Sequence, residues 1–150
     1  MFGTKLFRIR ALVEFGDVEA GELGGYVEKE SNLGHDDNAW VYDNAWVYGN
    51  ALVFGDARVC GNGDYAYAHG FGSVNRTTTF FRLKDGGVGV RCGCFYGTLA
   101  QFRDKIRETH GESAIAEEYL DLAALMEKRF RRTGTEDRRR KLRRMFITQN

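Results

Sequence analysis

The chain has 150 residues, with 19 glycines, three cysteines and no proline. A hydrophobic fraction of 43% and a charged fraction of 29% are typical of a folded domain and exclude a disordered chain, while glycine without proline excludes collagen-like and polyproline structure. The formal net charge of +1 conceals two opposite segments. Residues 14–64 carry eleven acidic and two basic residues, whereas residues 128–144 carry ten basic and two acidic ones. We expect this acidic body and basic tail to govern the choice of partner rather than the fold.

The sequence predicts a cytoplasmic protein without a membrane segment. No apolar stretch approaches the roughly 20 residues that span a bilayer, and no apolar signal segment follows Met1. An odd number of cysteines (Cys60, Cys92 and Cys94) does not form a disulfide framework. Because neither a C-x2-C pair nor a histidine pair accompanies them, structural thiols in a reducing compartment are favoured over a metal site.

The first half of the chain contains a six-residue repeat. Residues 6–13 alternate like a strand, and residues 17–33 indicate irregular turns. Five consecutive blocks then follow from His35 to Asp64: HDDNAW, VYDNAW, VYGNAL, VFGDAR and VCGNGD. The Gly or Asp followed by Asn or Asp in each block suits a corner with positive φ between short strands. The pattern resembles the hexapeptide repeat of the left-handed parallel β-helix, in which three six-residue sides close one triangular coil.

The repeat predicts which side chains face inward and which face outward. The inward positions are small or β-branched: Val41, Val47, Val53 and Val59, with Ala39, Ala45, Ala51 and Ala57. The outward positions hold five aromatic residues: Trp40, Tyr42, Trp46, Tyr48 and Phe54. Two interpretations of these aromatic residues remain open. They pack beneath the C-terminal half or in a homo-oligomer interface, or they form a docking surface for another macromolecule.

The chain after the repeat predicts a β-hairpin. Residues 65–71 are expected to lose the register of the repeat. Residues 77–83 and 88–95 are rich in β-branched and aromatic residues, and Asp85-Gly86 between them favours a tight turn. We therefore expect two antiparallel strands joined at that dipeptide.

Two helices are predicted after the hairpin. Thr98 and Gln101 form a capping-box signature at the start of the first helix, which is expected to end before Gly111. The second helix is expected to begin near Ser113. Its apolar residues recur at helical spacing as far as Phe130 and are predicted to cover the hairpin.

The C-terminal segment is very basic. Residues 133–135 (Thr-Gly-Thr) are predicted to break the second helix, and residues 136–146 to form a last helix or a tail. Three alternatives remain open: the segment is solvated or folds back on the acidic body, it binds nucleic acid directly, or it contacts an acidic protein surface. The candidate partner-binding residues here are Arg138, Arg139, Arg140, Lys141, Arg143 and Arg144.

The fold prediction is mainly β, and α+β overall. A short left-handed parallel β-helix with an N-terminal cap is predicted for residues 1–72, a β-hairpin with two helices for residues 73–132, and the basic tail or helix for residues 133–150.

Several motifs resemble those of a known group. They include Gly16-Asp-Val, the segment Leu23–Leu33, the repeated Asn-Ala-Trp-Val-Tyr, the sequence Thr-Thr-Thr-Phe-Phe-Arg-Leu-Lys-Asp-Gly from Thr77, and Gly-Cys-Phe-Tyr-Gly-Thr-Leu up to Leu99. This set resembles the small hexapeptide-repeat proteins of bacteriophages and prophages, over roughly residues 6–130. The resemblance implies a repeat prism followed by a hairpin and two helices, in the cytoplasm of an infected or lysogenic bacterium. The basic extension after Phe130 departs from the pattern.

The first function hypothesis is a non-catalytic phage accessory protein. It would present its acidic, aromatic surface and its basic tail to a host protein or protein–nucleic-acid complex, as a counter-defence inhibitor that acts by occlusion. The hypothesis includes a dimer or trimer, and it includes no cofactor, metal or membrane. A self-assembling structural protein is an alternative.

The second hypothesis is an acyltransferase that uses acyl-CoA, since such enzymes share the hexapeptide repeat. It requires a histidine base beside a cleft between the prisms of a trimer. His69 is the candidate, whereas His35 is expected to cap the first coil and His110 to lie at a helix end. No carboxylate in a recognised motif orients any of the three.

Overall fold

The computed structural model describes residues 3–72 and 76–148, with side chains described as far as Gly134. The strands are β1 (Phe7–Arg10), β2 (Leu23–Val27), β3 (Trp40–Val41), β4 (Trp46–Val47), β5 (Arg58–Val59), β6 (Tyr65–Phe71), β7 (Arg76–Arg82), β8 (Val88–Cys92) and β9 (Phe95–Thr98). The short 3-10 helices are η1 (Glu30–Asn32) and η2 (Asn62–Asp64). The two long helices are α1 (Leu99–His110) and α2 (Ala114–Thr148).

The described strands form three small sheets in an α+β fold. One sheet has the order β1-β2-β4, a second pairs β3 with β5, and the third is the antiparallel meander β6-β7-β8-β9. The predicted left-handed parallel β-helix is therefore wrong. The largest sheet is antiparallel and lies outside the repeat, and the two parallel pairings, β2–β4 and β3–β5, are each two residue pairs long.

The repeat nevertheless places its inward side chains as predicted. The four valines are fully buried and the four alanines are at most 2% exposed. The corner residues Asp43, Gly49 and Gly55 have φ values of 53°, 65° and 65°, as a tight corner requires. Each block thus contributes only two extended residues before it turns. Strands this short pair in isolated ladders, and the repeat forms a small core rather than a stacked coil.

Trp40 is buried, and its predicted outward position is wrong. Its side chain is 5% exposed and packs edge-to-face on Phe15, with ring centroids 5.3 Å apart. Gly24 on β2 provides the space, because a Cβ at that position would lie 2.8 Å from the indole ring. A glycine on a distant strand therefore decides where this tryptophan points.

The meander contains the predicted hairpin, formed by β7 and β8 around Asp85-Gly86. Residues 65–71 form β6 and pair along β7. Side chains of β7 alternate between two cores. Phe81 packs in the core of the first half, whereas Phe80 packs against the helices. The four-stranded sheet thus has an N-terminal layer on one face and a helical layer on the other.

The helix α1 begins as predicted. The Thr98 hydroxyl accepts a hydrogen bond from the Gln101 amide at 3.2 Å, and the Gln101 side chain accepts one from the Thr98 amide at 2.9 Å. The helix ends at His110, and Gly111 follows with a φ of 59°. The predicted apolar stripe of α2 is buried on the sheet, with Phe130 only 1% exposed.

The predicted break at residues 133–135 is wrong, because α2 runs through it without interruption. Arg82 on β7 supports the helix at this point. Its Nη2 donates to the Phe130 carbonyl at 2.8 Å and to the Thr133 hydroxyl at 3.0 Å, and its Nε lies 3.4 Å from an Asp64 carboxylate oxygen. These tertiary contacts outweigh the low helix propensity of Thr and Gly.

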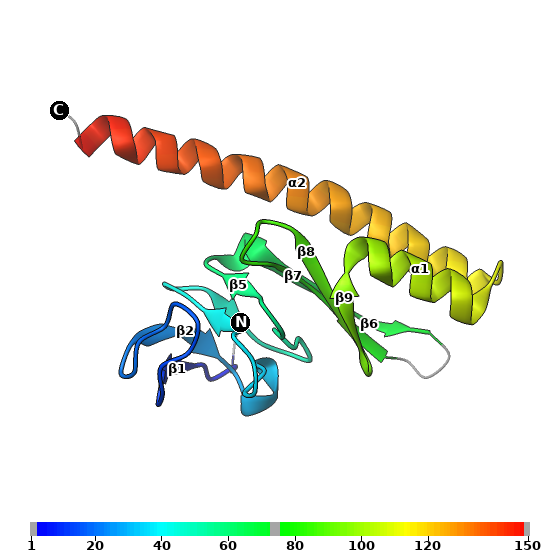
Figure 1. Cartoon of the computed structure of the whole chain (residues 1–150), viewed down its shortest axis with the longest axis horizontal. Coiled ribbons are helices and arrows are strands. Elements are labelled where there is room, and N and C mark those ends of the chain that lie inside the picture. Colours follow the sequence, from blue (N-terminus) through cyan, green and yellow to red (C-terminus); the bar gives the residue numbers. More distant parts are fainter. Residues whose placement is uncertain (1–2, 73–75, 149–150) are drawn as a thin grey trace.

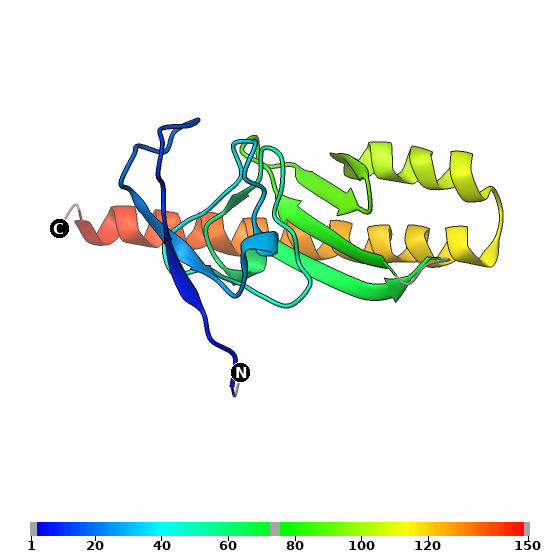
Figure 2. The same cartoon turned by 90° about the horizontal axis from the view of Figure 1, so that it is seen from below.

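The two helices lie on the same side of the four-stranded sheet. The N-terminal sheets lie on the left in Figure 1, away from α1. Viewed from below, α2 runs the length of the molecule, and its last turns extend past β1 and β2 (Figure 2). Among the described residues, no helix combines the length and the apolar character needed to cross a membrane.

Candidate functional site

Exposed apolar side chains are concentrated on the first sheet. Seven large apolar or aromatic residues are exposed in the described part of the chain, and five of them belong to β1, β2, β4 or the loop between β1 and β2. These five, called the apolar surface below, are Phe7, Leu12, Val13, Leu23 and Trp46, with exposed fractions of 52, 90, 65, 51 and 43%. Phe7 pairs with the buried Val27, so it lies on the edge strand at the opposite face of the sheet from Trp46. Exposed apolar side chains gathered in one region commonly mark a site of interaction.

A row of cationic and aromatic side chains crosses the same sheet. The strand register places Arg8, Tyr26 and Trp46 opposite one another on β1, β2 and β4. The Arg8 guanidinium lies 5.2 Å from the Tyr26 ring centre and donates to the Tyr26 hydroxyl at 3.2 Å. The next residues along β2 and β4, Val27 and Val47, are buried. The row therefore lies on the outer face, with residue types that are enriched at protein interfaces.

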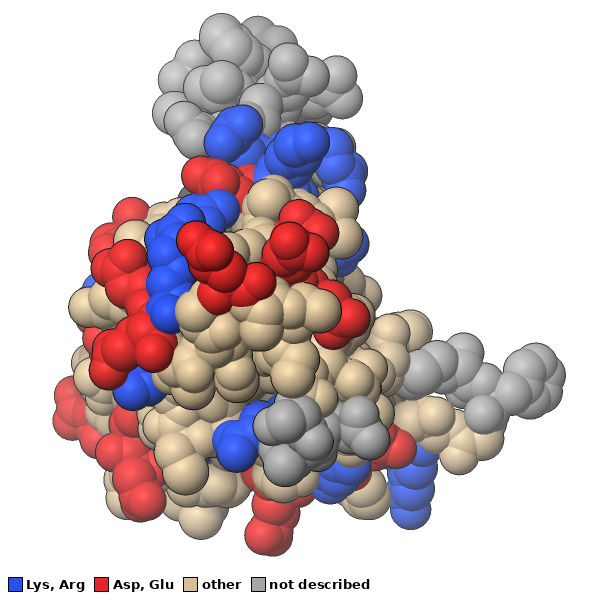
Figure 3. Space-filling model, turned by 90° about the vertical axis from the view of Figure 1, so that its right-hand side faces the viewer, with Lys and Arg blue, Asp and Glu red and all other residues tan. Residues whose placement is uncertain are grey.

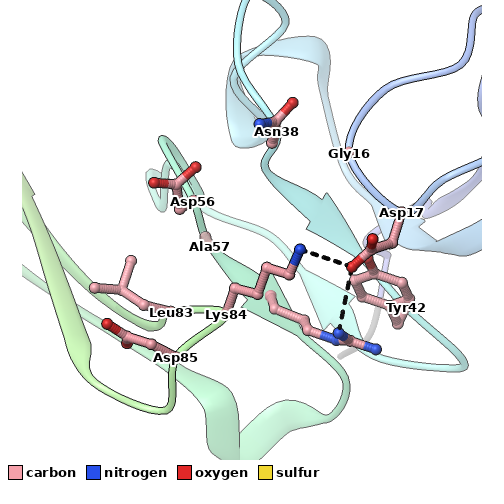
Figure 4. Close-up of a pocket in the computed structure, with 10 residues that line it drawn as sticks. Gly16, Asp17, Asn38, Tyr42, Asp56, Ala57, Leu83, Lys84 and Asp85 are labelled. Atoms are coloured by element: carbon pink, nitrogen blue, oxygen red, sulfur yellow. Dashed lines mark ion pairs between the residues drawn. The ribbon is translucent and has the colours of Figure 1, made fainter.

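A pocket of about 550 Å³ lies between the loop after β1 and the turn that joins β7 to β8. Asp17 stands at its centre: Lys84 Nζ lies 2.9 Å and Arg58 Nη1 4.0 Å from its Oδ2 (Figure 4). The hydrogen bond and the charge of Lys84, helped by Arg58, hold the pKa of the Asp17 carboxyl below its usual value. All three side chains are about half exposed or more, so solvent screens the ion pairs.

Both cations of this pocket are already paired with Asp17. The Arg58 guanidinium lies 4.9 Å from the centre of the Tyr42 ring, and burial raises the pKa of Tyr42. Two further carboxylates, Asp56 and Asp85, line the pocket, and no histidine or cysteine is among its described lining residues. The Lys84 amide also donates to the Asp56 carbonyl at 3.0 Å. The pocket therefore joins the first half to the β7–β8 turn, and its described lining also contains no serine or threonine.

The five aromatic residues predicted to face outward occupy different environments. Trp46 is exposed, Tyr42 is half-buried beside the pocket, and Trp40 is in the core. Tyr48 and Phe54 pack edge-to-face on tyrosines of β6 and β9, with ring centroids 6.5 and 5.1 Å apart. Packing beneath the second half thus accounts for two of the five, and exposure on the outer face for one.

The predicted basic partner-binding residues belong to α2, and their side chains lie outside the described residues. They are Arg138, Arg139, Arg140, Lys141, Arg143 and Arg144. The backbone of α2 continues to Thr148, so one helix carries the whole basic segment 128–144. Described Lys and Arg side chains gather toward the top of the end-on view (Figure 3).

The three histidines are dispersed. His69 is exposed on β6, with Nδ1 2.6 Å from the Thr77 hydroxyl, and among the described residues no carboxylate pairs with it. His35 Nε2 lies 3.0 Å from the Glu30 carbonyl, and the His110 ring stacks on Tyr119. Across the described residues, no three His, Cys, Asp or Glu side chains come together in a way that could hold a metal ion.

Comparisons with family models, with curated proteins and with solved structures give no match for this chain. The similarity to phage and prophage hexapeptide-repeat proteins therefore remains a prediction from the sequence motifs. Function has to be argued from the surface of the molecule itself.

Sequence reasoning identified Trp46 but missed the rest of the apolar surface, and it missed Arg8 and Tyr26 in the row beside Trp46. The alternation Phe7-Arg8-Ile9-Arg10 places both arginines on one face of a strand, which is a signal for an exposed basic row. The adjacent pair Leu12-Val13 is a second signal for exposed apolar side chains. Successive residues of an extended segment point to opposite sides, so at most one of the two can face a core. The residues that pair with β1 were not identifiable without the fold.

Proposed function

We propose that this chain is a non-catalytic binding protein that docks on a host protein through the apolar surface, with the basic helix α2 adding a second contact. The concentration of exposed apolar side chains on one small sheet carries the proposal. Burial of such side chains contributes roughly 25 cal/mol per Å² of apolar area, which makes this sheet the strongest source of binding free energy on the described surface.

The charges around the apolar surface favour a protein partner over a nucleic acid. The loop between β1 and β2 carries Glu14, Asp17, Glu19 and Glu22, and these carboxylates would repel phosphates. Arg8 is already stacked on Tyr26. The partner surface that would complement the apolar surface is therefore an apolar patch bordered by basic residues, and such patches occur on folded proteins.

The helix α2 supports the same proposal, because its segment 128–144 is basic whereas the first half of the chain is acidic. An acidic region on the partner would attract the segment 128–144, and such complementarity raises association rates and fixes orientation more than it raises affinity. The resemblance to phage and prophage proteins makes a bacterial protein the expected partner. Occlusion of a host defence complex is the expected consequence.

The acyltransferase hypothesis is not retained. It depended on a β-helix prism, whereas the described strands form three small sheets. His69 has a threonine hydroxyl rather than a carboxylate as its partner. Self-assembly through the apolar surface is an outcome that the following experiment distinguishes.

The experiment is affinity capture from nuclease-treated bacterial lysate with matched variants. The double variant Leu12→Asp, Leu23→Asp places charges in the apolar surface, and Leu125→Asp does the same on α2, where Leu125 is 59% exposed. We expect one stoichiometric host protein with the wild-type chain and with the control at about 0.15 M and about 0.5 M salt, since apolar contacts resist screening. The double variant should recover at least tenfold less.

Two results would contradict the proposal. Equal recovery with the double variant would exclude the apolar surface as the docking site. If the only protein recovered is untagged chain that has been added to the lysate, the apolar surface mediates self-association and not binding to a host protein.

A further inference from the structure

A second pocket, of about 320 Å³, lies between the helical layer and the end of the four-stranded sheet. The sheet contributes the start of β7 and the turn between β8 and β9, and the helices contribute the last turns of α1 and the first turns of α2. This volume suits a small organic molecule. The pocket is separate from the apolar surface and from the pocket around Asp17.

The ionisable side chains of this second pocket are cationic. Arg76 on β7 and Lys105 and His110 on α1 line it, whereas none of its described lining residues is Asp or Glu. The pocket around Asp17 differs in having three carboxylates against two cations. Of these two pockets, the second one has the excess of positive charge among its described lining residues.

The two permanent cations are available to a ligand. Within the described residues Arg76 has no ion pair, and Lys105 has only a distant one, 3.9 Å from an exposed Glu108 oxygen. Arg76 lies directly over Gly93, where a Cβ would collide with its guanidinium. The glycine, with a φ of 58°, thereby lets the Arg76 side chain lie close to the turn beside the pocket.

The floor of the pocket is apolar and aromatic. Phe95, Phe102 and Ile106 line it, and the rings of Phe95 and Phe102 are 5.8 Å apart. The ring of Tyr119 also lines the pocket and stacks on His110 at 6.1 Å. Phe102, Ile106 and Tyr119 are at most 6% exposed, so the half-buried Phe95 offers the main ring face to a ligand, and such a face suits an aromatic ring.

We propose that this pocket binds a small organic anion with an aromatic body. The carboxylate or phosphate group lies among Arg76, Lys105 and His110, where charge-assisted hydrogen bonds hold it. The ring lies against Phe95, whose side chain is half-buried at the pocket. This site does not depend on the proposed docking function.

The test is calorimetric titration of the full chain with phenyl phosphate and with benzoate. Benzyl alcohol serves as the neutral analogue, and inorganic phosphate as the anion without a ring. Arg76→Gln and Lys105→Gln should each weaken binding about tenfold or more, the loss expected for one charge-assisted hydrogen bond. Arg107→Gln removes the same charge from the exposed side of α1 and should change affinity less than about twofold.

Cysteine alkylation gives an independent readout. Cys94 is exposed and lines the pocket, whereas Cys60 lies in the first half, and burial raises the pKa of its thiol. A bound aryl anion should slow the reaction of Cys94 with iodoacetamide and leave the rate at Cys60 unchanged. The tighter of the two aryl anions identifies the preferred anionic group.

Three results would overturn the proposal. The first is that neither aryl anion binds at a concentration of roughly 5 mM, which would place the dissociation constant above the millimolar range. The others are equal binding of benzyl alcohol or of inorganic phosphate, which would exclude a role for the cations or for the aromatic floor.

Discussion

The two halves of the molecule are stabilised by different kinds of core. The first half packs small valines and alanines around one buried amide, Asn32, which is 1% exposed. The second half packs large aromatic side chains, among them Phe80, Phe102 and Phe130, between a sheet and two helices. The stability of the first core depends on hydrogen bonds to its backbone groups, whereas that of the second depends on the apolar area that its aromatic side chains bury. Each half should therefore be sensitive to a different class of substitution.

Asn32 shows how the first half is held together. Its carbonyl oxygen accepts from the amides of Glu28 and Lys29 at 3.2 and 2.9 Å, and its amide nitrogen donates to the carbonyls of Gly49 and Ala51 at 3.1 and 2.8 Å. One side chain thus bonds four backbone groups, of which the Glu28 amide also donates to the Val47 carbonyl at 3.1 Å.

The largest expected effect lies in the aromatic core. Phe102 is 1% exposed and lies edge-to-face on Phe80 and Tyr119 at 6.0 and 5.7 Å. Phe102→Ala should lower the free energy of unfolding by about 3–5 kcal/mol, because it removes buried area and leaves a cavity. Denaturant unfolding measures the loss. Phe7→Ala, at a residue 52% exposed, should cost less than about 1 kcal/mol. Equal losses would show that the aromatic cluster is not the main core.

The buried amide comes next. Asn32→Ala should cost about 3 kcal/mol, because it leaves several backbone groups buried without partners. Asn44→Ala, at an exposed position of the repeat, should change stability by less than about 0.5 kcal/mol. Thermal and denaturant unfolding of both variants would check this. An Asn32→Ala chain as stable as the control would mean that the first half does not rely on these hydrogen bonds.

The junction between the halves should have a smaller effect. Arg82→Gln should cost about 2 kcal/mol, because it leaves Asp64 without its cation and weakens the support of α2. Arg82→Lys keeps the charge and should restore part of that loss. Hydrogen exchange in α2 near Thr133 should quicken in the glutamine variant. Unchanged exchange there would indicate that the helix needs no support from β7.

The smallest effect concerns alkaline pH. Burial raises the pKa of Tyr119 to about 12, above the ordinary tyrosine value of 10.0. Between these values the unfolded chain loses the phenolic proton and the folded chain retains it, so stability falls as pH rises from 10 to 12. This difference in pKa lowers the free energy of unfolding by about 1 kcal/mol at pH 11. Stability measured against pH should decline less steeply in Tyr119→Phe, and an unchanged slope would refute this.

The sequence predicts some features of the two halves better than others. The capping box at Thr98, the turn at Asp85-Gly86 and the inward valines follow from local pattern, and all are confirmed. The assembly of the repeat, the burial of Trp40 and the continuity of α2 depend on distant residues. Gly24 makes room for the indole, and Arg82 supports the helix at its weakest propensity.

The candidate surface was predicted less completely. Alternation placed Trp46 outward correctly, but it could not identify β1 and β2 as the strands beside it. The exposed Leu12 and Leu23 belong to a hairpin whose irregular register, between Arg8 and Arg10, no local pattern specifies.

The most direct test of the account is hydrogen exchange of the chain alone and in complex with the host protein that it captures. We predict slower exchange in residues 7–13 and 23–27 on binding, together with slower exchange in α2 beyond Thr133. Slowing confined to β6–β9 and α1, with the first sheet unchanged, would contradict the assignment of the apolar surface as the docking site.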